Sequence, residues 1–228
     1  MNDLAKYRLF TPLVSYPDAG LPAAVERCTA MLGLQCPEAA ATLAPFAQWL
    51  AATPQHDQEE VYARTFHIQA ICYLDLGFVL FGEDYKRGEF LVNMKREQAQ
   101  AGNDCGDELP DNLANVLNLL PLLKDRELVA DLGGRVMVPA LRRMLEEFDS
   151  ARTTMRDRML RRKHNAILLE GRTDGNIYVH VLQALLQLLL TDFEERKAPA
   201  APSSQAFISG ASSCGTCTTH PKPQSQTT

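Results

Sequence analysis

The residues best suited to chemistry, by type and spacing, stand near the end of the chain. Two thiols and an imidazole occur together in Cys214-Gly215-Thr216-Cys217-Thr218-Thr219-His220. Such groups bind zinc and copper, but a structural zinc site needs four ligands and no second cluster supplies the fourth. Two interpretations stay open: a metal site formed by Cys214, Cys217 and His220, or two exposed thiols in a polar tail.

A carboxylate in an apolar setting is the second candidate. Asp75 lies in the most apolar part of the chain, which the pattern predicts to be helical. A buried lone carboxylate costs free energy, so it usually has a partner or a function. We expect Asp75 either to act in binding or to pair with an arginine such as Arg64 or Arg87.

The motifs of common catalytic sites are absent from the sequence. It contains no Gly-x4-Gly-Lys-Ser/Thr, no Gly-x-Gly-x-x-Gly, no Gly-x-Ser-x-Gly and no His-Glu-x-x-His. A di-metal site in a helical bundle needs Glu-x-x-His on two helices, and none of the five histidines has this spacing. We therefore expect a protein that is not an enzyme and binds no cofactor stably.

The apolar residues follow a helical period almost throughout, and no segment alternates like a strand. This pattern predicts an all-α, single-domain helical bundle over residues 1–196. After Lys197 the composition turns to Ala, Pro, Ser, Thr, Gln and Gly, which predicts a disordered tail at 197–228. The expected helices are one from Leu4 that ends at Pro17, about 20–33 with Gly33 as C-cap, Pro37 to before Pro54, one or two helices over Tyr62–Leu80, Lys86–Ala101 ending at Gly102, Asp111–Leu120 with Pro110 in its first turn, Arg126–Leu132, Val136–Met159 and Tyr178–Phe193.

Composition excludes several classes of partner. The net charge is −5, without the basic excess of a nucleic-acid-binding domain. No run of about 18 apolar residues is free of charge, so we expect no membrane span. The first residues lead directly into an amphipathic pattern, so we expect no signal peptide and a cytoplasmic protein with reduced cysteines. Cys28, Cys36 and Cys72 are expected in the core.

Charged residues gather in two groups. Acidic turns are expected at the ends of neighbouring helices, and a basic stretch runs from Arg152 to Lys163. If the acidic turns are functional, they attract a basic peptide by long-range steering. The acidic residues are Glu83, Asp84, Asp104, Asp107, Glu108 and Asp111.

Four short motifs stand out in the sequence. They are Leu13-Val14-Ser15-Tyr16-Pro17, Thr65-Phe66, Gly82 followed by Lys86-Arg87-Gly88, and Glu108-Leu109-Pro110-Asp111 before Leu113. In these motifs the chain resembles the NarJ-type branch of the TorD-like chaperones, which assemble molybdenum enzymes of the nitrate reductase and dimethyl sulfoxide reductase class. Three positions depart from the family: His67 stands where Asp is frequent, and Phe78-Val79 stand where a polar Glu-His pair is frequent.

The resemblance implies a cytoplasmic chaperone of the TorD-like fold type without catalytic activity. Such a protein binds the N-terminal leader of the apo catalytic subunit and keeps it ready for insertion of the molybdenum cofactor, which belongs to the client. Members of the wider family exchange helices between protomers, so a monomer and a domain-swapped dimer both fit, with a hinge expected within residues 161–176.

From these features we expect a groove beside the Tyr62–Leu80 segment that takes an amphipathic leader helix. Two other functions stay open: a metal-binding carrier that uses the C-terminal Cys/His cluster, and a helical peptide-binding adaptor unrelated to redox enzymes. The residues expected to line or flank the groove are Tyr62, Phe66, Asp75, Glu83, Asp84, Tyr85, Arg87, Glu108, Pro110 and Asp111.

Overall fold

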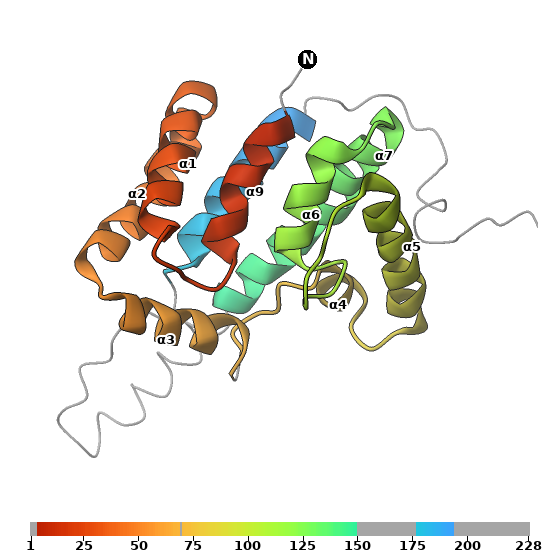
Figure 1. Ribbon diagram of the computed structural model, residues 1–228, viewed down its shortest axis with the longest axis horizontal. Helices are drawn as coiled ribbons and strands as arrows, with labels where there is room; N and C mark the ends of the chain where they lie inside the picture. Colours follow the sequence, from red (N-terminus) through yellow and green to blue (C-terminus); the bar gives the residue numbers. More distant parts are fainter. Residues whose placement is uncertain (1–3, 69, 150–176, 194–228) are drawn as a thin grey trace, which may run out of the picture.

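The computed structural model describes residues 4–68, 70–149 and 177–193 (Figure 1). Within these ranges every regular element is a helix, and a single isolated bridge pairs two extended residues. The expectation of an all-α fold is therefore confirmed. The tail expected at 197–228 and the hinge expected within 161–176 lie outside the described residues.

Short connections join most of the helices. Two of the helices, η1 and η2, are 3₁₀ helices, and η3 is a π-helix. In the described ranges no helix is both long and apolar enough to cross a lipid bilayer. In chain order the elements are η1 (Leu4–Val14), α1 (Leu21–Gln35), α2 (Pro37–Ala52), α3 (Gln55–Phe66), α4 (Leu76–Phe81), α5 (Tyr85–Ala101), α6 (Leu113–Leu119), η2 (Leu120–Leu122), α7 (Arg126–Ala130), η3 (Asp131–Met137), a helix at 138–149, and α9 (Val179–Phe193).

Helix η1 lies at the centre of the molecule. It packs against α1 and α9 and also against α6 and η2, while α2 covers α1 and α9 (Figure 1). Its apolar residues Leu4, Tyr7, Phe10 and Leu13 recur every three positions, which matches the three residues per turn of a 3₁₀ helix. Tyr7, Phe10 and Leu13 are fully buried, so the face of η1 that carries them lies in the core.

Buried polar contacts join η1 to α9. Lys6 Nζ lies 2.7 Å from Asp192 Oδ2, and the Tyr7 hydroxyl donates to the same oxygen at 2.7 Å. The side chains of the ion pair are only 6% and 7% exposed. Because removing one partner of a buried pair leaves an uncompensated charge, this contact holds the first described helix against the last.

Proline and glycine mark several helix ends, and those at Pro37 and Gly102 were expected. Pro22 and Pro37 stand in the first turns of α1 and α2, where a missing N–H costs nothing. Gly102 ends α5 with φ at +66°, a conformation that glycine adopts without strain. The prediction that Gly33 ends α1 is wrong, because the helix runs to Gln35; a glycine inside a helix costs only about 1 kcal/mol.

The apolar stretch from Tyr62 to Leu80 forms parts of two helices. Helix α3 ends at Phe66, and α4 begins at Leu76 after a non-helical connection. Asp75, expected inside a helix, therefore precedes α4 in an extended conformation. Its pairing with Asn112 in the isolated bridge accounts for the difference.

Helix α6 begins later than expected. The sequence predicts a start at Asp111 with Pro110 in the first turn, but the first helical residue is Leu113. The Asn112 side chain accepts a hydrogen bond from Ala114 N at 3.0 Å and so acts as the N-cap. The prediction used proline as the start signal and missed the capping asparagine two residues later.

The helices expected at Arg126–Leu132 and Val136–Met159 form one continuous helical segment over 126–149. Its middle is the π-helix η3, and residues 150–159 lie outside the described ranges. Phe193 of α9 packs directly on Gly133 of η3, where an added Cβ would lie 2.5 Å from Phe193 Cζ. The glycine therefore permits a close approach between α9 and η3.

Candidate functional site

Segments 70–75 and 103–112 meet along a short backbone bridge, and we call them the loop junction. Leu76 N donates to Asp111 O at 3.0 Å, and Leu113 N donates to Leu74 O at 2.9 Å. These bonds flank the antiparallel bridge at Asp75. The junction thus places Asp75 beside the Glu108–Asp111 motif, which follows it by more than 30 positions.

Amide side chains hold the second segment of the loop junction in place. Gln98 Nε2 donates to Pro110 O at 2.8 Å, and Asn115 Nδ2 donates to Leu109 O at 2.9 Å. Asn103 Nδ2 donates in turn to Gln98 Oε1 at 2.7 Å. Gln98 and Asn115 are buried, and buried polar groups need their hydrogen bonds. The loop therefore has a defined shape before any partner binds.

Asp111 supports this junction from inside. The residue is fully buried, and its Oδ2 accepts a hydrogen bond from Gly77 N in the first turn of α4 at 2.8 Å. Burial raises the pKa of the carboxyl group; the Gly77 hydrogen bond lowers it, and the nearby Asp75 raises it. A Cβ on Gly77 would lie 2.8 Å from the same oxygen. Asp111, which was expected to contact a client, therefore lies inside the junction and supports the start of α4.

Asp75 and Glu108 share one amide donor. Asn112 Nδ2 lies 3.4 Å from Asp75 Oδ1 and 3.5 Å from Glu108 Oε2. Burial raises the pKa of Asp75, whereas the Asn112 hydrogen bond, Arg87 and His67 lower it. Asp75 is half-buried and Glu108 is exposed. The loop junction thus presents two acidic side chains in a fixed arrangement.

The arginines considered as partners of Asp75 make other contacts. Arg64 forms an ion pair with Glu60, one turn earlier on α3. The Arg87 guanidinium lies 5.0 Å from the centre of the Phe78 ring, a cation–π contact. Its charge acts on Asp75, but no ion pair joins these two described side chains. The amide of Asn112, and no arginine, is the direct partner.

Tyr62 and Phe66 were expected to line a groove, and the structure places both in the core. They are 5% and 4% exposed, and their rings pack on buried Tyr178 at centroid distances of 5.7 and 5.1 Å. The Tyr62 hydroxyl donates to Val14 O at 3.2 Å. The accessible ring beside them is Tyr16, which is 58% exposed and meets Tyr62 edge-on.

The remaining expected residues divide between two places. Glu83 and Asp84 are exposed on the turn between α4 and α5, and Tyr85 is exposed as the first residue of α5. Asp84 caps α5 by accepting from Lys86 N at 2.9 Å. Pro110 is half-buried within the loop junction. The acidic turn before α5 is therefore a separate feature, and the carboxylates of the junction do not depend on it.

A pocket of about 390 Å³ adjoins the first segment of the loop junction. One wall is Phe78 and Val79 of α4, and another is the helix at 138–149. The Tyr73 and Phe78 rings meet edge-on at 4.7 Å. The lining residues are Ala70, Ile71, Cys72, Tyr73, Phe78, Val79, Arg143, Met144, Glu146 and Glu147.

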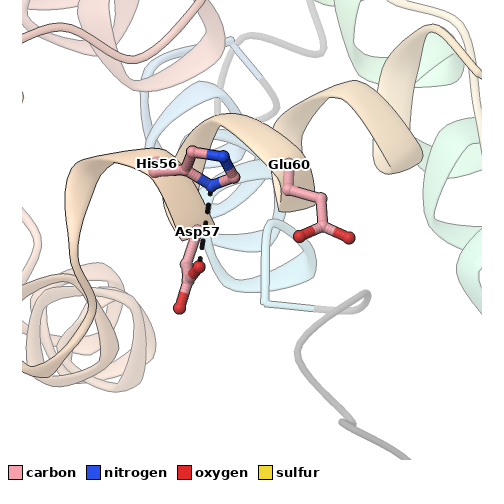
Figure 2. Close-up of side chains that lie close together, drawn as sticks. All are labelled: His56, Asp57 and Glu60. Atoms are coloured by element: carbon pink, nitrogen blue, oxygen red, sulfur yellow. Dashed lines mark ion pairs between the residues drawn. The ribbon is translucent and has the colours of Figure 1, made fainter.

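One group of metal-ligand residues occurs in the described ranges. His56, Asp57 and Glu60 of α3 place one ligand atom each within 4.8 Å of one another (Figure 2). The His56 side chain is 88% exposed, and Glu60 is already paired with Arg64. Because His56 is exposed and Glu60 is engaged by Arg64, we assign no function to this group. The candidates Cys214, Cys217 and His220 lie outside the described residues.

Sequence reasoning missed Asn112, Glu146 and Glu147 as parts of this region. An asparagine directly after Pro-Asp and before an apolar run is an N-cap signal that marks Asn112. The two glutamates had no such signal, because only the tertiary packing of their helix brings them to the pocket. Cys28, Cys36 and Cys72 are buried, as expected.

Comparison with models of known protein families finds no match for this chain, and comparison with curated protein sequences finds none either. The geometry of the loop junction and of the adjoining pocket is therefore the basis on which a function can be assigned.

Proposed function

We propose that this protein is an assembly chaperone for a molybdenum enzyme of the nitrate reductase and dimethyl sulfoxide reductase class. It binds the N-terminal leader of the apo catalytic subunit in the cytoplasm, before the molybdenum cofactor is inserted. The observation that carries the proposal is the loop junction, where Asn112 holds the Asp75 and Glu108 carboxylates at one accessible place. A basic peptide with apolar side chains complements such a surface.

Exposed apolar side chains on neighbouring segments support a peptide ligand. Tyr73 and Leu109, both in the loop junction, are 46% and 41% exposed. Tyr16 is 58% exposed beside Tyr62, and Ile68 at the end of α3 is 68% exposed. Single exposed apolar residues are ordinary, but apolar residues gathered beside acidic groups favour an interaction surface.

The fixed shape of the junction favours binding over chemistry. Hydrogen bonds from Gln98 and Asn115 already order its backbone, so little conformational entropy is lost when a partner binds. The half-buried Asp75 and the exposed Glu108 accept hydrogen bonds from arginine or lysine of the partner. Binding stabilises the open, apo form of the client by mass action.

A titration with the leader peptide of a candidate subunit tests the proposal. Neutralising both carboxylates in the Asp75→Asn/Glu108→Gln variant should weaken binding about tenfold and reduce its salt dependence. The matched control is Glu26→Gln on α1, which should bind like the wild type. Unchanged affinity of the double variant, or full metallation of the enzyme in cells that lack this protein, would contradict the proposal.

A further inference from the structure

Four oxidisable rings follow one another through the molecule, and we call Trp49, Tyr178, Tyr62 and Tyr16 the ring path. The ring centroids of Trp49 and Tyr178 lie 6.3 Å apart, and those of Tyr178 and Tyr62 lie 5.7 Å apart. The Tyr16 ring continues the series at 5.6 Å from Tyr62. Indole and phenol are side chains that lose a single electron readily, so the path joins α2 to the surface after η1 through groups that can exchange electrons.

Apolar packing closes the inner part of the ring path to water. Tyr178 and Tyr62 are buried, and so are Phe46 and Phe66. The rings of these two phenylalanines lie 5.2 and 5.1 Å from the Tyr178 ring, centroid to centroid, and fill the space beside it. Because electronic coupling falls steeply across gaps, rings in direct contact let an electron tunnel from one end of the path to the other.

The phenol groups of the ring path differ in where their protons can go. Loss of an electron makes a phenol strongly acidic, so a tyrosine holds a radical only where its proton has an acceptor. The buried Tyr178 hydroxyl has no partner among the described residues, and the Tyr62 hydroxyl donates to Val14 O, a weak base. Burial raises the pKa of both hydroxyl groups. Tyr16 is exposed, so its proton can leave to water.

Trp49, at the other end of the ring path, has a proton that cannot leave. Its Nε1 is buried without a hydrogen-bond partner in the part of the chain that the structure describes. An oxidised Trp49 indole therefore keeps its proton and stays a strongly oxidising radical cation. The side chain as a whole is half-buried, so a small oxidant in solution reaches its edge.

We infer that the ring path carries oxidising equivalents from Trp49 to Tyr16 and so protects the core from radical damage. A one-electron oxidant takes an electron from Trp49 and leaves the indole radical cation. An electron then passes from Tyr16 through the two buried rings to Trp49, while the Tyr16 hydroxyl proton leaves to water. The products are the reduced oxidant, intact Trp49 and a phenoxyl radical on Tyr16, which a dissolved reductant such as ascorbate converts back to the phenol with a hydrogen atom. This activity is independent of the proposed function.

Pulse radiolysis of the full chain tests the inference, with the azide radical as the one-electron oxidant. Azide radicals oxidise indole faster than neutral phenol, and Trp49 is the single tryptophan of the chain, so the indole-radical absorbance reports on one residue. We expect this absorbance to decay as the tyrosyl-radical absorbance rises, at a rate that does not depend on protein concentration. Tyr16→Phe should slow this transfer about tenfold or more, because the phenol that releases its proton to water is gone.

Two matched controls separate the ring path from other tyrosines. Tyr85→Phe removes a phenol that is 89% exposed on α5, which lies across the molecule from α2 (Figure 1); the transfer rate should not change. Tyr178→Phe keeps a bridging ring and removes only a hydroxyl that releases no proton, so transfer should persist. Urea unfolding of each variant shows that the fold is kept.

Several results would overturn the inference. Equal transfer rates in Tyr16→Phe and the wild type would exclude Tyr16 as the end of the path, and loss of transfer in Tyr178→Phe would place the radical on a buried ring. The Tyr7 hydroxyl donates to the Asp192 carboxylate, a base that could take its proton. Transfer that disappears in Tyr7→Phe and persists in Tyr16→Phe would make Tyr7 the end point instead.

Mass spectrometry after prolonged exposure to azide radicals tests the protective role. The wild type should accumulate dityrosine cross-links at Tyr16, whereas Tyr16→Phe should accumulate oxidised Trp49. Ascorbate added during the exposure should reduce the cross-links of the wild type. Equal oxidation of Trp49 in the two proteins would overturn the protective role.

Discussion

Replacing Asp111 should weaken the fold by an amount that depends on what replaces it. In Asp111→Ala the Gly77 N–H loses the acceptor that lies 2.8 Å away and stays buried without a partner. Such a loss costs about 1–3 kcal/mol, reduced by the gain from no longer burying a carboxylate. We expect the free energy of unfolding to fall by about 2 kcal/mol.

Asp111→Asn should cost less, about 1 kcal/mol or below. The amide oxygen still accepts from Gly77 N, and no charge has to be buried. The new amide NH₂ takes the place of Oδ1, which has no hydrogen-bond partner among the described residues. Because this amide donor is unpaired, the free energy of unfolding of Asp111→Asn should not exceed that of the wild type by much near neutral pH.

The pH dependence of stability shows how burial affects the ionisation of Asp111. Burial raises the pKa of this carboxyl group in the folded protein, so the unfolded chain, with a pKa of about 3.9, releases the proton first as pH rises. Below the unfolded pKa the carboxyl group is neutral in both states and costs nothing. Above it, wild-type stability falls until the folded pKa is passed, so Asp111→Asn should gain stability relative to the wild type over that interval.

Urea unfolding followed by far-ultraviolet circular dichroism, between about pH 4 and pH 8, measures these differences. Asp107→Ala, an exposed change in the same segment, is the control and should stay within about 0.5 kcal/mol of the wild type. An Asp111→Ala variant as stable as the wild type would refute the structural role of the hydrogen bond. A relative loss of stability in Asp111→Asn with rising pH would refute the sign of the pKa argument.

Three further substitutions test the packing, each by urea unfolding. Gly133→Ala should cost about 1–3 kcal/mol, because its Cβ would lie 2.5 Å from Phe193 Cζ; Gly134→Ala, with its Cβ at 3.7 Å from Phe193 Cβ, should not destabilise, and equal effects would contradict the reasoning. Asp192→Ala should lower the free energy of unfolding by about 3–5 kcal/mol, because it leaves a buried ammonium group unpaired. A loss of less than about 1 kcal/mol would contradict an ion pair that is shielded from water. Tyr178→Phe should be neutral or up to about 1 kcal/mol stabilising, because the buried hydroxyl has no partner among the described residues; a clear loss would reveal one.

Helices with strong end signals were predictable from the sequence. Pro37 and Gly102 stand at the boundaries that the structure has for α2 and α5, since their backbone preferences are local. Gly33 carried the same signal but lies inside a helix. Its neighbour Leu32 is fully buried, and tertiary packing of this kind overrides a local preference.

The candidate site was predictable only in part. Asp75 stood out as a carboxylate in an apolar stretch, and Glu108 and Asp111 stood out as parts of acidic turns. The structure brings them together. Their pairing through Asn112 links residues 37 positions apart, and no local pattern encodes such a contact. Tyr62 and Phe66 belong to a stretch that is apolar on nearly every side, so the sequence did not show that their rings face Tyr178 and not the surface.

The ion pair between Lys6 and Asp192 has a consequence for biosynthesis. A ribosome delivers the N-terminus first, so η1 emerges long before the aspartate that neutralises its lysine. Until α9 has left the exit tunnel, the nascent chain carries a central helix whose cation and neighbouring tyrosine lack their acceptor. Native packing around η1 is therefore completed only after translation has passed residue 192, and a truncation that removes α9 leaves Lys6 and Tyr7 without their acceptor.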